Sequence, residues 1–90
     1  MAVEKVLVVG MGAMGRGIAQ VCAQAGIDTY AYDISKEAAE KGLKAIERDI
    51  GKRVEKGKIS AADKEAIMSR ITLVDSFEQA KDVDIVEEAV

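Results

Sequence analysis

The sequence of 90 residues contains no histidine, no proline and no tryptophan, and it has a single cysteine. Without histidine there is no imidazole to act as a general base, to complete a nucleophilic triad or to bind zinc. We therefore expect no metal site. Cys22 has no partner in this sequence for a disulfide, and it shares a predicted helical face with apolar residues, so we expect it to be a small buried hydrophobic side chain.

Basic patches and long apolar runs are missing as well. The formal net charge is −3 and aromatic residues make up 3% of the chain, and no run of lysine and arginine is interleaved with aromatics. These properties argue against a nucleic-acid partner. No apolar segment of about 20 residues and no signal-peptide pattern is present, so we expect no membrane partner. With one cysteine, a reducing compartment is favoured, and we expect the cytoplasm.

What the chain does contain is enough apolar sequence to fold. Hydrophobic residues make up 49% and charged residues 32% of the total, without a low-complexity segment or a visible linker. This composition is that of an ordinary globular protein. We expect residues 1–90 to form a single domain.

The most informative pattern lies near the start. The continuous apolar run of residues 6–9 predicts a buried parallel strand over residues 5–9, and a helical pattern over residues 13–25 ends at Gly26. A second strand is predicted over residues 27–32, directly before Asp33. Between the first strand and the helix stands Gly10-Met11-Gly12-Ala13-Met14-Gly15. Together these segments predict one βαβ unit with a glycine-rich turn.

Each glycine of this turn has a physical role in binding a dinucleotide. Gly10 permits a sharp turn, Gly12 removes the Cβ that would keep a pyrophosphate away from the backbone, and Gly15 lets helix and strand pack closely. The free N–H groups at the start of the helix then face the phosphates. The alternative is a glycine turn that is only structural. The position of Asp33, 18 residues after Gly15, favours the dinucleotide site.

The rest of the chain predicts three further helical segments and two further strands. Ser35 is a predicted N-cap of a long amphipathic helix that ends near Gly57, and Ser60 with Asp63 predicts a capping box for a helix through Arg70. Strands are predicted over residues 71–74 and 83–86, with one helical turn over 76–80 between them. Gly42 and Gly51, inside the long helix, should each cost about 1 kcal/mol unless close packing compensates.

This order of elements predicts an α/β fold. We expect a truncated Rossmann fold: a parallel four-stranded sheet with strand order 3-2-1-4, flanking helices, and a two-helix excursion after the second strand. Both walls of a nucleotide crevice are then present.

The sequence resembles the N-terminal segment of the 3-hydroxyacyl-CoA dehydrogenase family. The resemblance is carried by residues 6–20, by Tyr32-Asp33 and the charged helix after it, by residues 54–60 and 70–72, and by the closing residues 84–90. It implies NAD as cofactor, with binding residues at Gly10, Met11, Gly12, Ala13, Met14, Gly15, Asp33 and Ala89. The Asp33 carboxylate is expected to accept hydrogen bonds from the adenosine ribose and to repel the extra phosphate of NADP.

The resemblance also implies a contact between Lys56 and coenzyme A, although a solvated lysine at a helix C-terminus is the simpler interpretation. Asp49 stands where the family has a serine that contacts coenzyme A. Glu87 stands where the family has an apolar residue, and we expect it to be exposed or paired at a sheet edge, because a buried unpaired carboxylate is costly. The family's catalytic serine, histidine, glutamate and asparagine have no counterpart in these 90 residues.

Two functional hypotheses follow. The first is an NAD(H)-binding module similar to the first half of such a dehydrogenase and inactive by itself. The second is a structural or self-assembling half-Rossmann unit that binds little or no cofactor. An exposed fourth strand predicts a homodimer formed along the sheet edge, although Asp84, Glu87 and Glu88 could instead keep that edge solitary. A third idea, a redox-sensing regulator, has no DNA-reading segment to support it.

Overall fold

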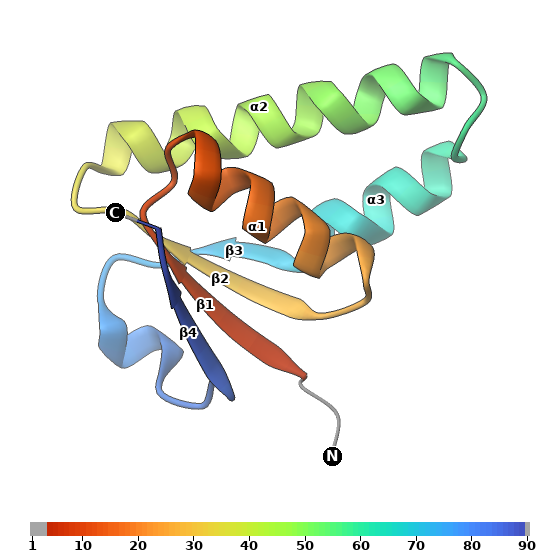
Figure 1. Cartoon of the computed structure of the whole chain (residues 1–90). Coiled ribbons are helices and arrows are strands. Elements are labelled where there is room, and N and C mark those ends of the chain that lie inside the picture. Colours follow the sequence, from red (N-terminus) through yellow and green to blue (C-terminus); the bar gives the residue numbers. More distant parts are fainter. Residues whose placement is uncertain (1–3, 90) are drawn as a thin grey trace.

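The computed structural model describes residues 4–89 as a parallel sheet with helices on both faces. The elements in these residues are β1 (Lys5–Val9), α1 (Ala13–Gln24), β2 (Asp28–Tyr32), α2 (Lys36–Glu55), α3 (Ala61–Ser69), β3 (Ile71–Leu73), the 3-10 helix η1 (Phe77–Ala80) and β4 (Ile85–Glu88). The strand order is β3-β2-β1-β4 and every neighbouring pair is parallel, as predicted. Helices α1, α2 and α3 lie on one face, and η1 lies on the other (Figure 1).

The predicted N-caps of α2 and α3 are present in the structure. Ser35 caps α2, because its hydroxyl accepts a hydrogen bond from the N–H of Ala38 at 3.2 Å. Ser60 and Asp63 form the reciprocal capping box of α3, with N···O distances of 3.0 and 3.4 Å. Gly57, with φ of 71°, follows the end of α2. These bonds satisfy backbone groups that have no partner within the helix.

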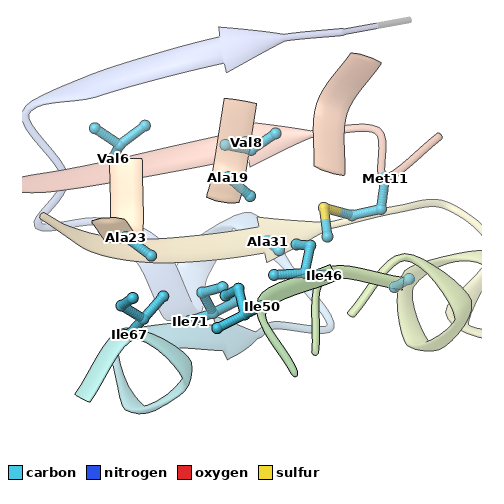
Figure 2. Close-up of a cluster of buried hydrophobic side chains, with 11 residues drawn as sticks. Val6, Val8, Met11, Ala19, Ala23, Ala31, Ile46, Ile50, Ile67 and Ile71 are labelled. Carbon is cyan, nitrogen blue, oxygen red and sulfur yellow. The ribbon is translucent and has the colours of Figure 1, made fainter. Parts of the chain in front are cut away.

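The main core lies between the sheet and the three α-helices (Figure 2). Val6 and Val8 of β1 and Ala31 of β2 point toward this layer, where they meet the apolar stripe of α2 that includes Ile46 and Ile50. Alanines of α1 bring this helix close to the sheet. The opposite face has a smaller cluster of Leu7, Val74 and Ala80 beneath η1, and there the rings of Tyr32 and Phe77 lie 4.9 Å apart.

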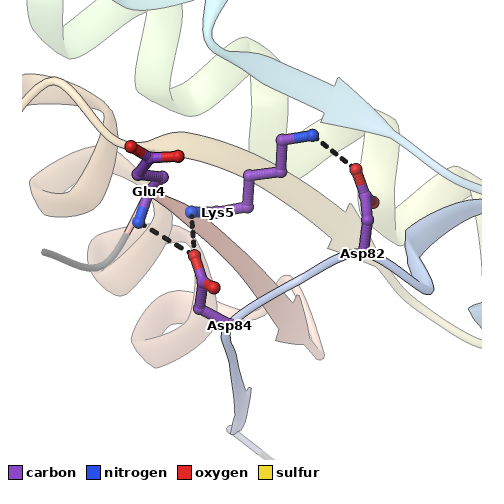
Figure 3. Close-up of polar contacts among 4 residues, drawn as sticks. All are labelled: Glu4, Lys5, Asp82 and Asp84. Atoms are coloured by element: carbon purple, nitrogen blue, oxygen red, sulfur yellow. Dashed lines mark hydrogen bonds and ion pairs between the residues drawn. The ribbon is translucent and has the colours of Figure 1, made fainter. Parts of the chain in front are cut away.

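Strand β4 is displaced from its predicted position. The predicted range of residues 83–86 was wrong, because the strand begins at Ile85 and ends at Glu88. The reason is a set of polar contacts with the start of β1 (Figure 3). Asp84 accepts the N–H groups of Glu4 and Lys5 at 2.9 and 3.0 Å, and the Lys5 ammonium pairs with Asp82. Asp84 is therefore used as an anchor before the strand rather than as part of it.

All four residues of β4 are exposed, since nothing in residues 4–89 pairs with its outer edge. Glu87 is thus exposed on an edge strand, as expected. Five other boundaries differ from the prediction by one residue: α1 ends at Gln24, β2 begins at Asp28, α3 ends at Ser69, β3 ends at Leu73 and η1 begins at Phe77. Such shifts are normal where helix and strand ends fray.

Cys22 was predicted to be a buried hydrophobic side chain; it packs against the main core but is only half-buried. It lies on the part of α1 that packs against the main core without being enclosed by it. Burial, and secondarily the nearby Glu87 carboxylate, raise the pKa of its thiol. A raised pKa leaves less of the nucleophilic thiolate at neutral pH.

Candidate functional site

The predicted site residues gather at the carboxyl ends of the strands. Strand β1 lies between β2 and β4. The strand order therefore reverses at β1, because β2 and β3 follow on one side of it and β4 on the other. In open parallel sheets this switch point is where ligands bind. The glycine-rich turn after β1, Asp33 after β2 and Ala89 after β4 all lie there.

The turn itself is closed by Gly10 and Gly15. Gly10 has φ of 94°, a conformation that side chains rarely allow, and its N–H donates to the carbonyl of Tyr32 at 2.7 Å. A Cβ on Gly15 would lie 1.5 Å from the carbonyl oxygen of Gly10 and 3.4 Å from the Cβ of Ala89. This contact requires glycine at position 15, and any other residue at position 10 would be strained. Ala89 is held beside it by a hydrogen bond from its N–H to the Val9 carbonyl at 2.8 Å.

The outer side of the turn is open. Gly12 is the N-cap of α1, no side chain accepts a hydrogen bond there, and the first turn of the helix has no acidic residue. A Cβ on Gly12 would have no atom of residues 4–89 within 4 Å. Ala13 and Met14 follow in the exposed first turn, and the Met14 side chain is 71% exposed. The backbone N–H groups and the positive end of the helix dipole therefore face free space, as an anion site requires.

Asp33 faces this turn from the end of β2. Its Oδ2 accepts the N–H of Met11 at 2.8 Å, and its Oδ1 accepts the N–H of Ser35 at 2.9 Å. These two hydrogen bonds, that from Met11 being the larger effect, hold the pKa of the carboxyl group below its ordinary value of 3.8. The group is thus ionised at neutral pH, and each oxygen keeps capacity to accept another hydrogen bond.

Met11 has a different role from that of its neighbours in the turn. Its side chain is 1% exposed and points toward Ala31 and Ile46 in the core (Figure 2). Its N–H group is bonded to Asp33 and is therefore not an open donor for an anion. Among the predicted site residues, the open backbone face begins at Gly12.

The residues that line a cavity beside Asp33 were not predicted from the sequence. A small cavity of about 120 Å³ lies between the ends of β2 and β3, lined by Tyr32, Asp33, Ile34, Lys36, Ala39, Leu73, Val74 and Asp75. Its residues after β3 carry no motif. The predicted strand order was the one available signal, because it places the end of β3 next to the end of β2.

A second hollow lies between α1 and α2 on the outer surface. This groove of about 510 Å³ is lined in part by four cationic side chains, those of Arg16, Arg48, Lys52 and Arg53. Asp49 lies among them. Its carboxylate accepts a hydrogen bond from the Gln20 amide at 2.6 Å and forms an ion pair with Arg53 at 3.5 Å. Lys56 is exposed at the C-cap of α2.

Among residues 4–89, no three or more histidine, cysteine, aspartate or glutamate side chains are grouped so that they could hold a metal ion. In the same residues, no helix has the length and apolar character needed to cross a membrane.

The parallel sheet, the open glycine turn and the acidic residue after β2 define a dinucleotide-binding α/β domain. The chain belongs to the family described as 3-hydroxyacyl-CoA dehydrogenase, NAD binding domain, which matches residues 5–90. This confirms the resemblance noted from the sequence and the NAD cofactor that it implies.

Individual relatives agree with the family. The chain is 39% identical to the probable 3-hydroxybutyryl-CoA dehydrogenase of Bacillus subtilis over all of its own length and 31% of that protein. It is also 39% identical to the fatty acid oxidation complex subunit alpha of Colwellia psychrerythraea over 99% of its own length and 12% of that protein. Among solved structures, the 3-hydroxybutyryl-CoA dehydrogenase of Escherichia coli superposes with a TM-score of 0.96 and 36% identity, covering all of this chain and 19% of that one. The chain therefore spans a third or less of these proteins.

Proposed function

We propose that residues 1–90 act as a single NAD(H)-binding domain, the cofactor half of a 3-hydroxyacyl-CoA dehydrogenase. The observation that carries this proposal is the open backbone at Gly12, Ala13 and Met14, which supplies uncapped N–H groups at the positive end of α1. In this role the turn binds the pyrophosphate, with Gly10 and Gly15 shaping it and Ala89 bordering it. Bound NAD supplies the hydride chemistry.

The ribose assignment rests on Asp33. The carboxylate is ionised, half-buried and fixed at the end of β2, where its remaining lone pairs are free to accept ribose hydroxyl groups. The cavity beside it, with Leu73 and Val74 in its wall, suits the apolar faces of an adenine ring. Ile34 is 94% exposed at the same rim, and a bound nucleotide would cover part of it.

Titration with NADH and NADPH tests this proposal. We expect saturable binding of NADH and much weaker binding of NADPH, because a 2′-phosphate would meet the Asp33 charge. Equal affinity for the two cofactors would contradict the Asp33 role, and the absence of any heat or chemical-shift change at millimolar NADH would contradict the site itself. We also expect no oxidation of NADH by the pure chain with a 3-oxoacyl-CoA, because these 90 residues contain no histidine that could transfer the proton.

A contact with coenzyme A is a second part of the proposal. The supporting observation is the cationic groove between α1 and α2, one turn of helix before the exposed Lys56. Coenzyme A carries a 3′-phosphate that such side chains attract, whereas Asp49 reduces the positive charge there. We expect coenzyme A to bind more tightly than its dephosphorylated form, with a smaller difference in Lys56→Ala than in the control Lys58→Ala. Equal binding of the two ligands by the wild type would exclude the contact.

The alternative function, a self-assembling unit, is favoured by one observation. No strand within residues 4–89 pairs with the outer edge of β4, where Val86 is 52% exposed, and such edges pair with other strands. We propose a homodimer through this edge in the cytoplasm, the compartment that a chain with one cysteine suits. Light scattering should give a dimer mass for the wild type and for Thr72→Lys on the opposite edge strand, but a monomer for Val86→Lys. A monomeric wild type would contradict this proposal.

A further inference from the structure

Met11 is held from two sides by the segment that follows β2. Its N–H group donates to Asp33 at 2.8 Å, and its side chain is buried in the core. The residue stands directly between Gly10, where the chain turns, and Gly12, where the open backbone begins. The position of Met11 therefore sets the direction in which the next N–H groups point.

The first support is the Asp33 carboxylate. Because Ser35 N–H occupies Oδ1 at 2.9 Å, the carboxylate is oriented from both sides by backbone groups of its own chain. A group fixed in this way needs no ligand to bring it into place. Preorganisation of this kind reduces the free-energy cost of ordering a site when a ligand binds.

The second support is the absence of a side chain at Gly42 in α2. A Cβ there would lie 2.7 Å from the carbonyl oxygen of Met11 and 3.1 Å from its Cβ. The backbone of α2 therefore packs directly against the turn. Gly51 in the same helix differs, since its Cβ would meet only the flexible end of Lys64 at 3.5 Å. Glycine is unfavourable inside a helix, and the close approach to Met11 explains why it occurs at position 42.

We propose that Asp33 and Gly42 are positioning residues for the glycine-rich turn, acting through Met11 on the affinity for the diphosphate. This inference rests on the proposed function and deepens it. Asp33 has two separable effects, one on the ribose hydroxyl groups and one on the shape of the turn. Gly42 has only the second.

The hydrogen bond from Met11 N–H to Asp33 can be tested without any ligand by amide hydrogen exchange of Met11, followed by NMR. We expect slow exchange in the wild type, fast exchange in Asp33→Ala, and an intermediate rate in Asp33→Asn, whose side-chain oxygen still accepts one hydrogen bond. Exchange at Met11 that is equally slow in the wild type and Asp33→Ala would overturn the proposal. This measurement stays decisive even if NADH fails to bind, in which case the proposed function fails by itself.

The effect on binding is measured with 2′,3′-dideoxyadenosine diphosphate, which has the diphosphate but no ribose hydroxyl groups. We expect Asp33→Ala to weaken this probe about tenfold, the loss that corresponds to one hydrogen bond to a charged group. Gly42→Ala should weaken it also, whereas the matched control Gly51→Ala should not. If Asp33→Ala weakens NADH but leaves the dideoxy probe unchanged, Asp33 acts on the ribose alone and the proposal is wrong. If circular dichroism shows that Gly42→Ala does not fold, the two Asp33 variants still test whether Asp33 positions the glycine-rich turn.

Discussion

The carbonyl oxygen of Gly10 occupies the place where a side chain at Gly15 would begin, 1.5 Å from an ideal Cβ. No rearrangement of a flexible group can relieve this contact, because both partners are backbone. Gly17, one residue beyond Arg16 in the same helix, would place its Cβ in open space. The two glycines thus have opposite structural consequences.

We therefore expect Gly15→Ala to destabilise the fold by several kcal/mol, since the turn and the first part of α1 must shift. Gly17→Ala should stabilise it by about 1 kcal/mol, because alanine is a better helix former than glycine. Urea unfolding followed by circular dichroism measures both. Equal stability of the two variants would show that the close approach of Gly10 and Gly15 is not a feature of the native state.

Gly12 provides a different test, because it separates binding from folding. Its φ of −68° is available to any residue, and a Cβ there has no neighbour within 4 Å. We expect Gly12→Ala to leave the free energy of unfolding within about 0.5 kcal/mol of the wild type, which is usual for substitutions that disturb no contact.

The added methyl group of Gly12→Ala would nevertheless occupy the space in front of the open N–H groups. We expect NADH affinity to fall at least tenfold, measured by titration calorimetry. Unchanged affinity in a stably folded Gly12→Ala variant would mean that no phosphate approaches this part of the backbone.

Much of this architecture could be predicted from local sequence. Residues 6–9 of β1 are a continuous apolar run with both faces of the sheet covered, and the starts of α2 and α3 are marked by Ser35 and by Ser60 with Asp63. Burial and capping are properties of a short window. The strand order then followed from the position of the glycine-rich turn.

The parts that could not be predicted depend on contacts between distant residues. The start of β4 is set by Asp84 bonding to Glu4 and Lys5, about 80 positions earlier in the chain. Gly42 and Gly51 both lie inside α2, yet of the two only Gly42 packs against Met11. Likewise, the sequence identified Asp33 as a ligand-binding residue but did not predict its hydrogen bond to Met11, which joins two residues 22 positions apart.

The anchor of β4 makes stability depend on pH. Hydrogen bonds from Glu4 N–H and, next, Lys5 N–H hold the pKa of Asp84 below its ordinary value of 3.8, and a hydrogen bond from Lys5 lowers the pKa of Asp82. A carboxyl group with a depressed pKa in the folded state stabilises the protein above its unfolded pKa, and this contribution is lost as the pH falls through the folded value. We expect the thermal midpoint to fall as the solution is acidified below about pH 4.

Asp84→Asn should reduce this dependence. Its midpoint should be lower than that of the wild type at neutral pH, and the two should converge in acid. Glu65→Gln on the exposed side of α3 is the control and should follow the wild type. Parallel pH profiles for the wild type and Asp84→Asn would show that the carboxylate does not hold β4 in solution.

Arg70 connects the end of α3 to the end of α1. Its guanidinium donates a hydrogen bond from Nη1 to the carbonyl of Ala23 at 2.8 Å, and the side chain is half-buried. The Ala23 carbonyl also accepts the N–H of Gly26 at 3.1 Å, and a cation is favoured at this end of the helix by the helix dipole. We expect Arg70→Ala to lower the free energy of unfolding by about 2 kcal/mol, the range for a hydrogen bond from a charged group.

The control is Arg48→Ala, which removes an exposed cation from α2 and should change the free energy of unfolding by less than about 0.5 kcal/mol. Because the bond closes α1 at the end opposite the glycine-rich turn, Arg70→Ala should leave NADH affinity unchanged at temperatures where the variant is folded. An equal loss of stability in the two arginine variants would mean that net charge, rather than this bond, accounts for the effect.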